Sequence, residues 1–195
     1  MNLIAALKKD HVHAENIAKV LASLRKGLGA CDIPFAIVGG LALRYHGYTR
    51  FTEDIDLLTT KEGLDAIHAN LTQLGLTPRF PNARKSLRDT ERGVKVDVIT
   101  AGERAGSGDS PVVFPAPGSR SFVTRDGMRV PTLATLVTLK LASGVWGRRL
   151  HDLGDVARLI AANRVTRGFA TKLPKDLRAK FLEIFDQAAG EKTLE

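Results

Sequence analysis

The chain has 195 residues, of which 44% are hydrophobic and 26% are charged, a composition that is ordinary for a globular protein. Its single cysteine, Cys31, excludes an internal disulfide framework, and no apolar run approaches the length of a membrane span. We therefore expect a cytoplasmic protein with no segment in a membrane. The net charge of +8 fits a polyanionic partner such as tRNA or another RNA, and equally a solvated basic surface.

The first half of the chain predicts alternating helices and strands. Leu3–Leu28 has helical spacing and ends at glycines, and an apolar strand at Phe35–Val38 follows it. Further along, the pattern predicts a helix at Gly40–His46, a strand at Asp54–Leu58, a helix at Lys61–Leu74, a strand at Leu76–Phe80, and a hairpin that pairs Arg84–Thr90 with Val94–Thr100.

The second half begins with a loop and a hairpin and is then entirely helical. Ala101–Pro111 is rich in glycine and serine, and Asp126-Gly127 predicts a tight turn between two short strands. From Thr132 onward all periodicity is helical. The sequence thus predicts an α/β (α+β) core with an N-terminal helix over residues 1–130, and a C-terminal helical region over residues 131–195.

The segment between the first two strands carries the strongest chemical signal. A strand that breaks at Gly39 and Gly40 and enters a helix presents backbone N–H groups to phosphate. Asp54 and Asp56 are two residues apart on the next strand, so their side chains share one face. Asp97 alternates with valines on a later strand that can lie beside them. Three carboxylates around Mg²⁺ ions favour phosphoryl or nucleotidyl transfer, whereas an acidic turn and an exposed strand edge are the plainer readings.

A lysine lies on the apolar face of the first C-terminal helix. Lys140 follows Leu133 by seven residues and Leu136 by four, so it shares their face. Such a lysine either extends to solvent or meets an anion, for which a bound triphosphate is a candidate.

The order of these motifs resembles the nucleotidyltransferase superfamily of the polymerase-β type. Within it, the stretch VGGLAL…HGYTRFTEDIDLL is similar to the AbiEii-like nucleotidyltransferases, many of which are toxins of type IV toxin–antitoxin pairs. The resemblance runs from Phe35 to Ile160 and includes Arg149, Asp152 and Asp155 near its end. It implies a nucleotidyltransferase-type mixed sheet with flanking helices, and transfer of a nucleoside monophosphate from a nucleoside triphosphate to an acceptor hydroxyl.

The same resemblance implies partners and site residues. The acceptor would be the 3′ end of tRNA, the protein partner a cognate antitoxin, and the cofactor two Mg²⁺ ions. Asp152 would pair with Lys140 or contact the nucleotide, whereas its position alone equally fits a carboxylate at a helix start. From the residues themselves, Arg50 either neutralises triphosphate charge or lies in a solvated loop, and Arg149 either contacts phosphate or flanks the helix start. The expected catalytic residues are Asp54, Asp56, Asp97, Lys140 and Asp152, of which the first three also bind metal; the expected nucleotide-binding residues are Gly39, Gly40, Arg50, Lys140 and Arg149.

Two other functions remain open from the residues. A nucleotidyltransferase that modifies a small molecule such as an aminoglycoside would take a cationic acceptor, which calls for an acidic pocket. A catalytically silent nucleotide- or RNA-binding module would keep the fold without turnover. The three intact aspartates favour an active enzyme, and the basic residues near the site favour an anionic acceptor.

Overall fold

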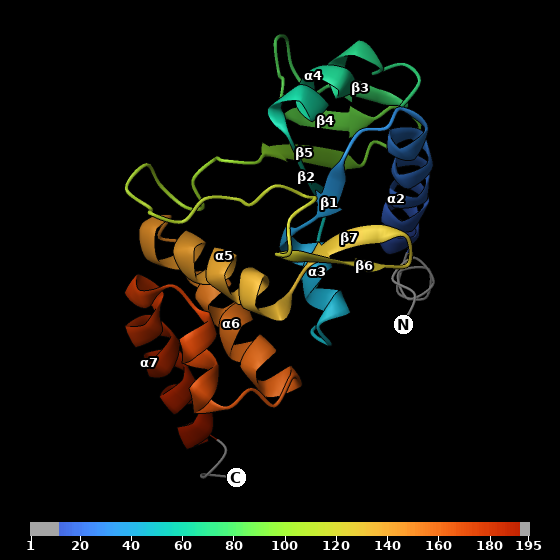
Figure 1. Ribbon diagram of the computed structural model, residues 1–195. Coiled ribbons are helices and arrows are strands. Elements are labelled where there is room, and N and C mark those ends of the chain that lie inside the picture. Colours follow the sequence, from blue (N-terminus) through green and yellow to red (C-terminus); the bar gives the residue numbers. More distant parts are fainter. Residues whose placement is uncertain (1–11, 192–195) are drawn as a thin grey trace.

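The computed structural model describes residues 12–191, so the predicted start of the first helix at Leu3 lies outside the described residues. Figure 1 shows a sheet with helices beside it and a separate group of helices below. The strands are β1 (Phe35–Ile37), β2 (Asp54–Thr59), β3 (Leu76–Pro78), β4 (Ser86–Asp89), β5 (Lys95–Thr100), β6 (Phe122–Arg125) and β7 (Met128–Pro131). The helices are α2 (Val12–Ala30), α3 (Gly39–Tyr45), α4 (Lys61–Ala69), α5 (Leu133–Trp146), α6 (Leu150–Ala162) and α7 (Lys175–Glu191), with a 3₁₀ turn η1 (Arg167–Lys172).

The main sheet is mixed, as predicted, with the strand order β1-β2-β5-β4-β3. Only β2 and β5 run parallel among these neighbours, and β4 pairs with β5 as the predicted hairpin. In the parallel pair, Asp54 lies opposite Lys95 and Asp56 lies opposite Asp97. The central position of β2 and β5 therefore brings two distant parts of the sequence into register.

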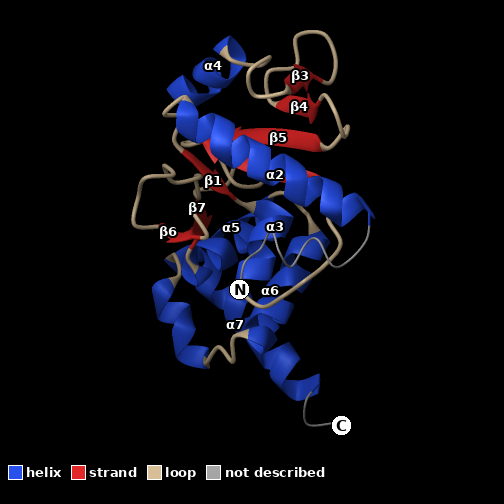
Figure 2. Cartoon of the chain, turned by 90° about the vertical axis from the view of Figure 1, so that its right-hand side faces the viewer, coloured by secondary structure: helices blue, strands red, loops and turns tan. Residues whose placement is uncertain are grey.

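The two faces of this sheet differ in character. On one face Ile55 and Leu57 of β2, with Val96 of β5, pack into a core covered by α2 and α4. Figure 2 shows α2 crossing the sheet on that side. Because strand side chains alternate, Asp56 and Asp97 point to the opposite face, which is covered only in part.

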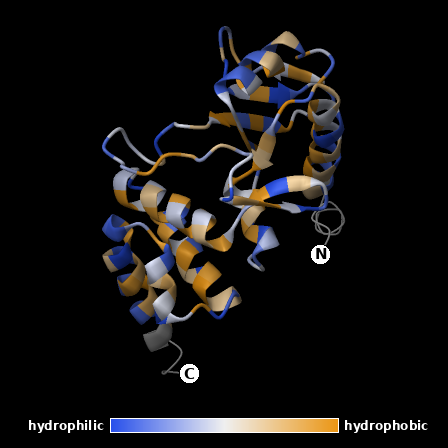
Figure 3. Ribbon diagram, viewed as in Figure 1, coloured by the Kyte–Doolittle hydropathy of each residue, from blue (hydrophilic) through white to orange (hydrophobic). Residues whose placement is uncertain are grey.

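A second core forms among α5, α6 and α7, and the orange of α6 in Figure 3 marks part of it. Leu136, Leu159 and Phe181 are fully buried there. Leu43 of α3 packs in the same cluster, so the helical region shares its core with the α/β part. This packing holds α5 and α6 opposite the open face of the sheet.

Several elements end earlier than predicted. The helix expected at Lys61–Leu74 stops at Ala69, because the amide of Asn70 bonds back to the Ala66 carbonyl and turns follow up to Gly75 at φ +66°. The strand expected to reach Phe80 stops at Pro78. Within residues 12–191, no helix has both the length and the apolar character needed to cross a membrane.

Candidate active site

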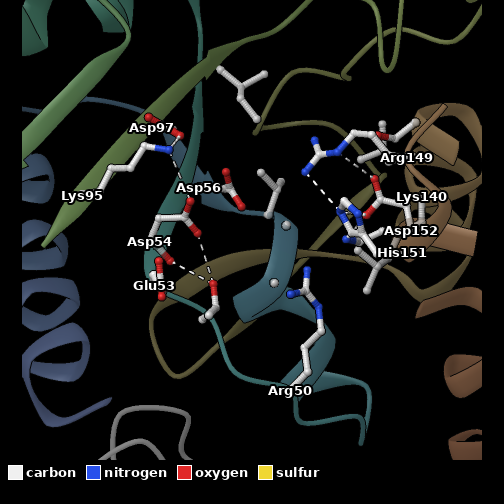
Figure 4. Close-up of a pocket in the computed structure, with 18 of the residues that line it drawn as sticks. Arg50, Glu53, Asp54, Asp56, Lys95, Asp97, Lys140, Arg149, His151 and Asp152 are labelled. Atoms are coloured by element: carbon white, nitrogen blue, oxygen red, sulfur yellow. Dashed lines mark hydrogen bonds and ion pairs between the residues drawn. The ribbon is translucent and has the colours of Figure 1, made fainter. Parts of the chain in front are cut away.

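Three carboxylates meet on the open face of the sheet. Asp54 and Asp56 lie on β2, and Asp97 lies on the parallel neighbour β5. One oxygen from each lies within 4.8 Å of the others, a spacing that suits a bound metal ion. The predicted meeting of these three aspartates is therefore present in the structure (Figure 4).

Negative charge is concentrated at this point. Burial, together with the charges of Asp54 and Asp97, raises the pKa of Asp56 from 3.8 to about 6. Lys95 forms ion pairs with Asp97 and, at 3.5 Å, with Asp54. The hydrogen bond to Asp97 raises the pKa of Lys95, so this side chain is a cation at neutral pH. One lysine thus faces three carboxylates.

Two hydroxyl groups orient the outer carboxylates. Ser86 on β4 donates to Asp97 Oδ1 at 3.1 Å, and Thr52 donates to Asp54 Oδ1 at 3.2 Å. The sequence analysis did not single out Ser86, Thr52 or Lys95 as site residues. Strand alternation places Lys95 on the same face as Asp97, so the sequence could have predicted its position in the site. The contact of Ser86 with Asp97 could not be predicted in this way, because it depends on the register of β4 against β5.

The glycine pair closely approaches the carboxylates. Gly39 has φ +61°, and a Cβ there would lie 1.8 Å from Asp56 Oδ2. A Cβ at Gly40 would lie 2.9 Å from Thr52 Oγ1 and 3.7 Å from Arg50 Nη2. Both positions therefore need glycine for space, and Gly39 also needs it for its backbone conformation.

The opposite wall of the pocket is a cluster of buried ion pairs. Lys140 Nζ lies 2.6 Å from Asp152 Oδ1 and 2.8 Å from Asp155 Oδ2. The exposed fractions of the three side chains are 8%, 2% and 3%. Burial alone would raise the pKa of Asp152, but Lys140 holds it below its usual value. The sequence had suggested a triphosphate as the anion beside Lys140, whereas in the structure two carboxylates of the chain occupy that role.

Two exposed residues border this cluster. Arg149 Nε lies 3.4 Å and His151 Nε2 lies 3.5 Å from the Asp152 carboxylate. Both line the pocket, and the Arg149 side chain is 60% exposed. The pairing of Asp152 with Lys140 is thus observed, and Arg149 lies where an anion in the pocket could reach it.

A pocket of about 490 Å³ separates the two walls. Gly39 and Gly40 line it with the three aspartates, and Arg50, Lys140, Arg149 and Asp152 line it from other directions. Phe51 lines it as well and is 65% exposed, a residue that the sequence analysis did not single out. The volume lies in the range of small-molecule and cofactor sites.

Comparison with known proteins agrees with this geometry. Residues 24–194 match the family described as "Nucleotidyl transferase AbiEii toxin, Type IV TA system". The chain belongs to the AbiEii nucleotidyltransferase family. No curated protein matches it.

Solved structures of nucleotidyltransferases share the fold of this AbiEii family member. A candidate nucleotidyltransferase from H. pylori is 18% identical, with a TM-score of 0.52 over 94% of this chain and 83% of that one. The antibiotic-resistance factor ANT(2″)-Ia is 14% identical, with a TM-score of 0.50 over 90% of this chain and 94% of that one. These structures support the expected mixed α/β fold, and the family match identifies the chain as a nucleotidyltransferase.

Proposed function

We propose that this nucleotidyltransferase transfers a nucleoside monophosphate from a nucleoside triphosphate to the 3′ end of tRNA, as the toxin of a type IV toxin–antitoxin pair. The observation that carries the proposal is the three-aspartate cluster, which lies across the pocket from Lys140 and Arg149 and next to two obligatory glycines. Family membership supports the toxin role and a cognate antitoxin as the protein partner. Cytoplasmic action follows from these substrates.

The donor set fits Mg²⁺. Asp54, Asp56 and Asp97 offer only oxygen ligands, which hard cations prefer. Burial, and after it the charges of Asp54 and Asp97, raises the pKa of Asp56, and a bound cation would oppose both effects. We propose that these residues hold Mg²⁺, with two ions as the expected number. When bound, the metal would neutralise phosphate charge and lower the pKa of an acceptor hydroxyl.

Other residues of the pocket would bind the triphosphate and support the transfer step. Asp97 would help to activate the acceptor hydroxyl by taking its proton. The acceptor oxygen forms a bond to the α-phosphorus, the bond from that phosphorus to the bridging oxygen breaks, and pyrophosphate leaves. Gly39 and Gly40 leave room for the triphosphate, while Arg50 and Arg149 supply positive charge beside it. Lys140, held by Asp152, lies close enough to lower the pKa of Asp56 and so supports its ionised form.

The boundary near Pro131 also has a functional meaning in this proposal. Residues 1–130 would carry the glycines and the metal ligands, and residues 131–195 would carry Lys140, Arg149 and Asp152. A complete site would then need residues from both parts, and the packing of Leu43 in the helical cluster keeps these parts in contact.

The test is a transfer assay with each α-labelled nucleoside triphosphate, Mg²⁺ and total tRNA. The Asp54→Asn/Asp56→Asn double variant is the negative control. Asp65→Asn is the matched control, because Asp65 is an exposed carboxylate on α4 that pairs with Arg84 outside the pocket. Label in tRNA with the intact protein and with Asp65→Asn, but not with the double variant, is the expected result.

Two outcomes would overturn the tRNA proposal. Label transferred to an added aminoglycoside but not to tRNA would establish a small-molecule nucleotidyltransferase. Nucleotide binding without transfer to either acceptor would establish a silent module. Growth arrest on expression, absent with the double variant and relieved by the protein encoded alongside, tests the toxin–antitoxin role separately.

A further inference from the structure

Arg50 reaches across the boundary between the sheet and the helical region. It lies in the connection between α3 and β2, and its Nη2 atom is 3.7 Å from the position of a Cβ on Gly40. Its Nε atom lies 3.2 Å from Asp155 Oδ1, on α6. The guanidinium thus lies beside the glycines while a carboxylate of the helical region holds its other edge. Figure 4 shows Arg50 between the aspartates of the sheet and the cluster of Lys140 and Asp152.

Asp155 holds two cations from different parts of the chain. Its Oδ1 atom faces Arg50, and its Oδ2 atom faces Lys140 at 2.8 Å. Among the described residues, Arg50 Nε and Asp155 Oδ2 have no hydrogen-bond partner. The contacts of Asp155 with Arg50 and with Lys140 are therefore ion pairs whose geometry does not meet that of a hydrogen bond. Asp155 is nearly fully buried and does not line the pocket. It therefore acts on the pocket only through the cations that it holds.

We propose that Asp155 is a positioning residue that fixes the guanidinium of Arg50 beside Gly40, where it meets the triphosphate of the bound nucleotide. This inference rests on the proposed nucleotide site and assigns to α6 a part in nucleotide binding that involves no contact with the nucleotide. Lys140 has a second anchor, since it donates a hydrogen bond to Asp152 at 2.6 Å. The other contact of Arg50 is a hydrogen bond of 3.3 Å from Nη1 to the carbonyl of the adjacent Phe51, within the same loop. Asp155 is the carboxylate that Arg50 meets in a described ion pair, so Arg50 depends on Asp155 more than Lys140 does.

The sign of one measurement separates positioning from simple charge neutralisation. Asp155→Asn removes a negative charge next to Arg50 and Lys140 and keeps nearly the same shape. If Asp155 only neutralised these cations, the variant would present more positive charge and would bind triphosphate more tightly. If Asp155 positions Arg50, the variant binds triphosphate more weakly, because a pre-organised charge-assisted contact is lost.

The experiment measures the dissociation constant of inorganic tripolyphosphate and of each nucleoside triphosphate by calorimetry in Mg²⁺. We expect Asp155→Asn to weaken binding about tenfold, roughly the effect of one charge-assisted hydrogen bond. In an Arg50→Gln background, Asp155→Asn should alter binding by less than about twofold, since the guanidinium that Asp155 positions is gone. Asp65→Asn, which removes an exposed partner of Arg84, should leave binding unchanged.

Each outcome decides the inference. Unchanged or tighter binding by Asp155→Asn overturns it, as does an equal loss in both Arg50 backgrounds. If the intact protein binds neither tripolyphosphate nor any nucleotide, the proposed nucleotide site fails and the inference falls with it. Thermal melting checks the fold of each variant. Should Asp155→Asn not fold, Asp155→Glu keeps the charge but moves the carboxylate, and the same weakening is expected.

Discussion

The two walls of the pocket contain similar groups but balance their charges differently. On the sheet wall, Asp54, Asp56 and Asp97 face the single cation of Lys95. On the helical wall, Lys140 lies between two carboxylates, and Arg50 and Arg149 provide further positive charge. On the sheet wall the three carboxylates therefore outnumber the cation of Lys95, whereas on the helical wall each carboxylate has cations of the chain beside it.

We expect this difference to appear in stability: the charges of the helical wall stabilise the fold, and those of the sheet wall destabilise it when no ligand is bound. Removing one partner of a buried ion pair is strongly destabilising, because it leaves the other partner as an unpaired charge in the interior. An excess of like charge, by contrast, destabilises the fold until a ligand neutralises it. The comparison predicts that matched changes on the two walls have opposite effects on the free energy of unfolding.

The largest expected effect is on the helical wall. Lys140→Met would leave the buried carboxylates of Asp152 and Asp155 without their shared cation. We expect the free energy of unfolding to fall by about 3–5 kcal/mol, measured by urea denaturation at pH 7. The triple variant that adds Asp152→Asn and Asp155→Asn should recover part of this loss. No recovery would show that the methylene packing of Lys140, and not its charge, stabilises this wall.

A change of opposite sign is expected on the sheet wall. Asp56→Asn removes a carboxylate whose pKa is raised to about 6 by burial and by two like charges. At pH 7 with a chelator present, we expect the free energy of unfolding to rise by about 1–3 kcal/mol, since about 1.4 kcal/mol corresponds to each unit of pKa shift. Nucleotide transfer should be abolished in the same variant. A less stable Asp56→Asn protein would contradict the idea of uncompensated charge.

The pH dependence of stability should also separate the walls. Because the folded-state pKa of Asp56 is raised, the folded state binds the extra proton between about pH 4 and pH 6, and stability falls as the pH rises through that window. Asp152 has a lowered pKa, so its stabilisation is present above its ordinary value of 3.8 and is lost at more acidic pH. Unfolding curves with a chelator from pH 3 to 7 test both signs. The advantage of Asp56→Asn should shrink toward pH 4.

The smallest effect is expected for Lys95. This lysine is the internal cation of the sheet wall, and its side chain is about one-third exposed. Lys95→Met should lower metal-free stability by less than about 1 kcal/mol, because solvent screens an exposed pair. Removing this competing cation should tighten the binding of Mn²⁺, measured by electron paramagnetic resonance. Weaker Mn²⁺ binding would show that Lys95 supports the metal ligands instead of competing with a metal.

Local sequence patterns were sufficient to predict the three aspartates of the sheet wall, although not the side chains that contact them. Two aspartates at alternate positions on one strand must share a face, and Asp97 between valines must point away from the core. The order of motifs then carried the resemblance to the AbiEii family, which the match over residues 24–194 confirmed. The end of the helix near Asn70 and the end of the strand at Pro78 were less predictable, because side-chain caps and sheet ends decide them locally.

The helical wall required the tertiary structure. Helical periodicity placed Lys140 on an apolar face, where a lysine either extends to solvent or meets an anion. The family resemblance offered Asp152 as its partner, and Asp155 was not predicted as a second one. The packing of α5 against α6 brings Asp152 and Asp155 to that lysine, and the path of the chain from α3 to β2 brings Arg50 to Asp155. The role that we propose for Asp155 therefore depends on its contact with Arg50, which lies about a hundred positions earlier in the chain.

The sequence by itself determined that the three carboxylates share one face of the sheet, because strand alternation converts spacing along the chain into direction in space. It also determined the fold family through the order of its motifs. Only the tertiary structure decided which charges neutralise one another, since that depends on distances between elements that no local period encodes. Asp54, Asp56 and Asp97 outnumber the cation of Lys95, while Lys140 pairs with both Asp152 and Asp155.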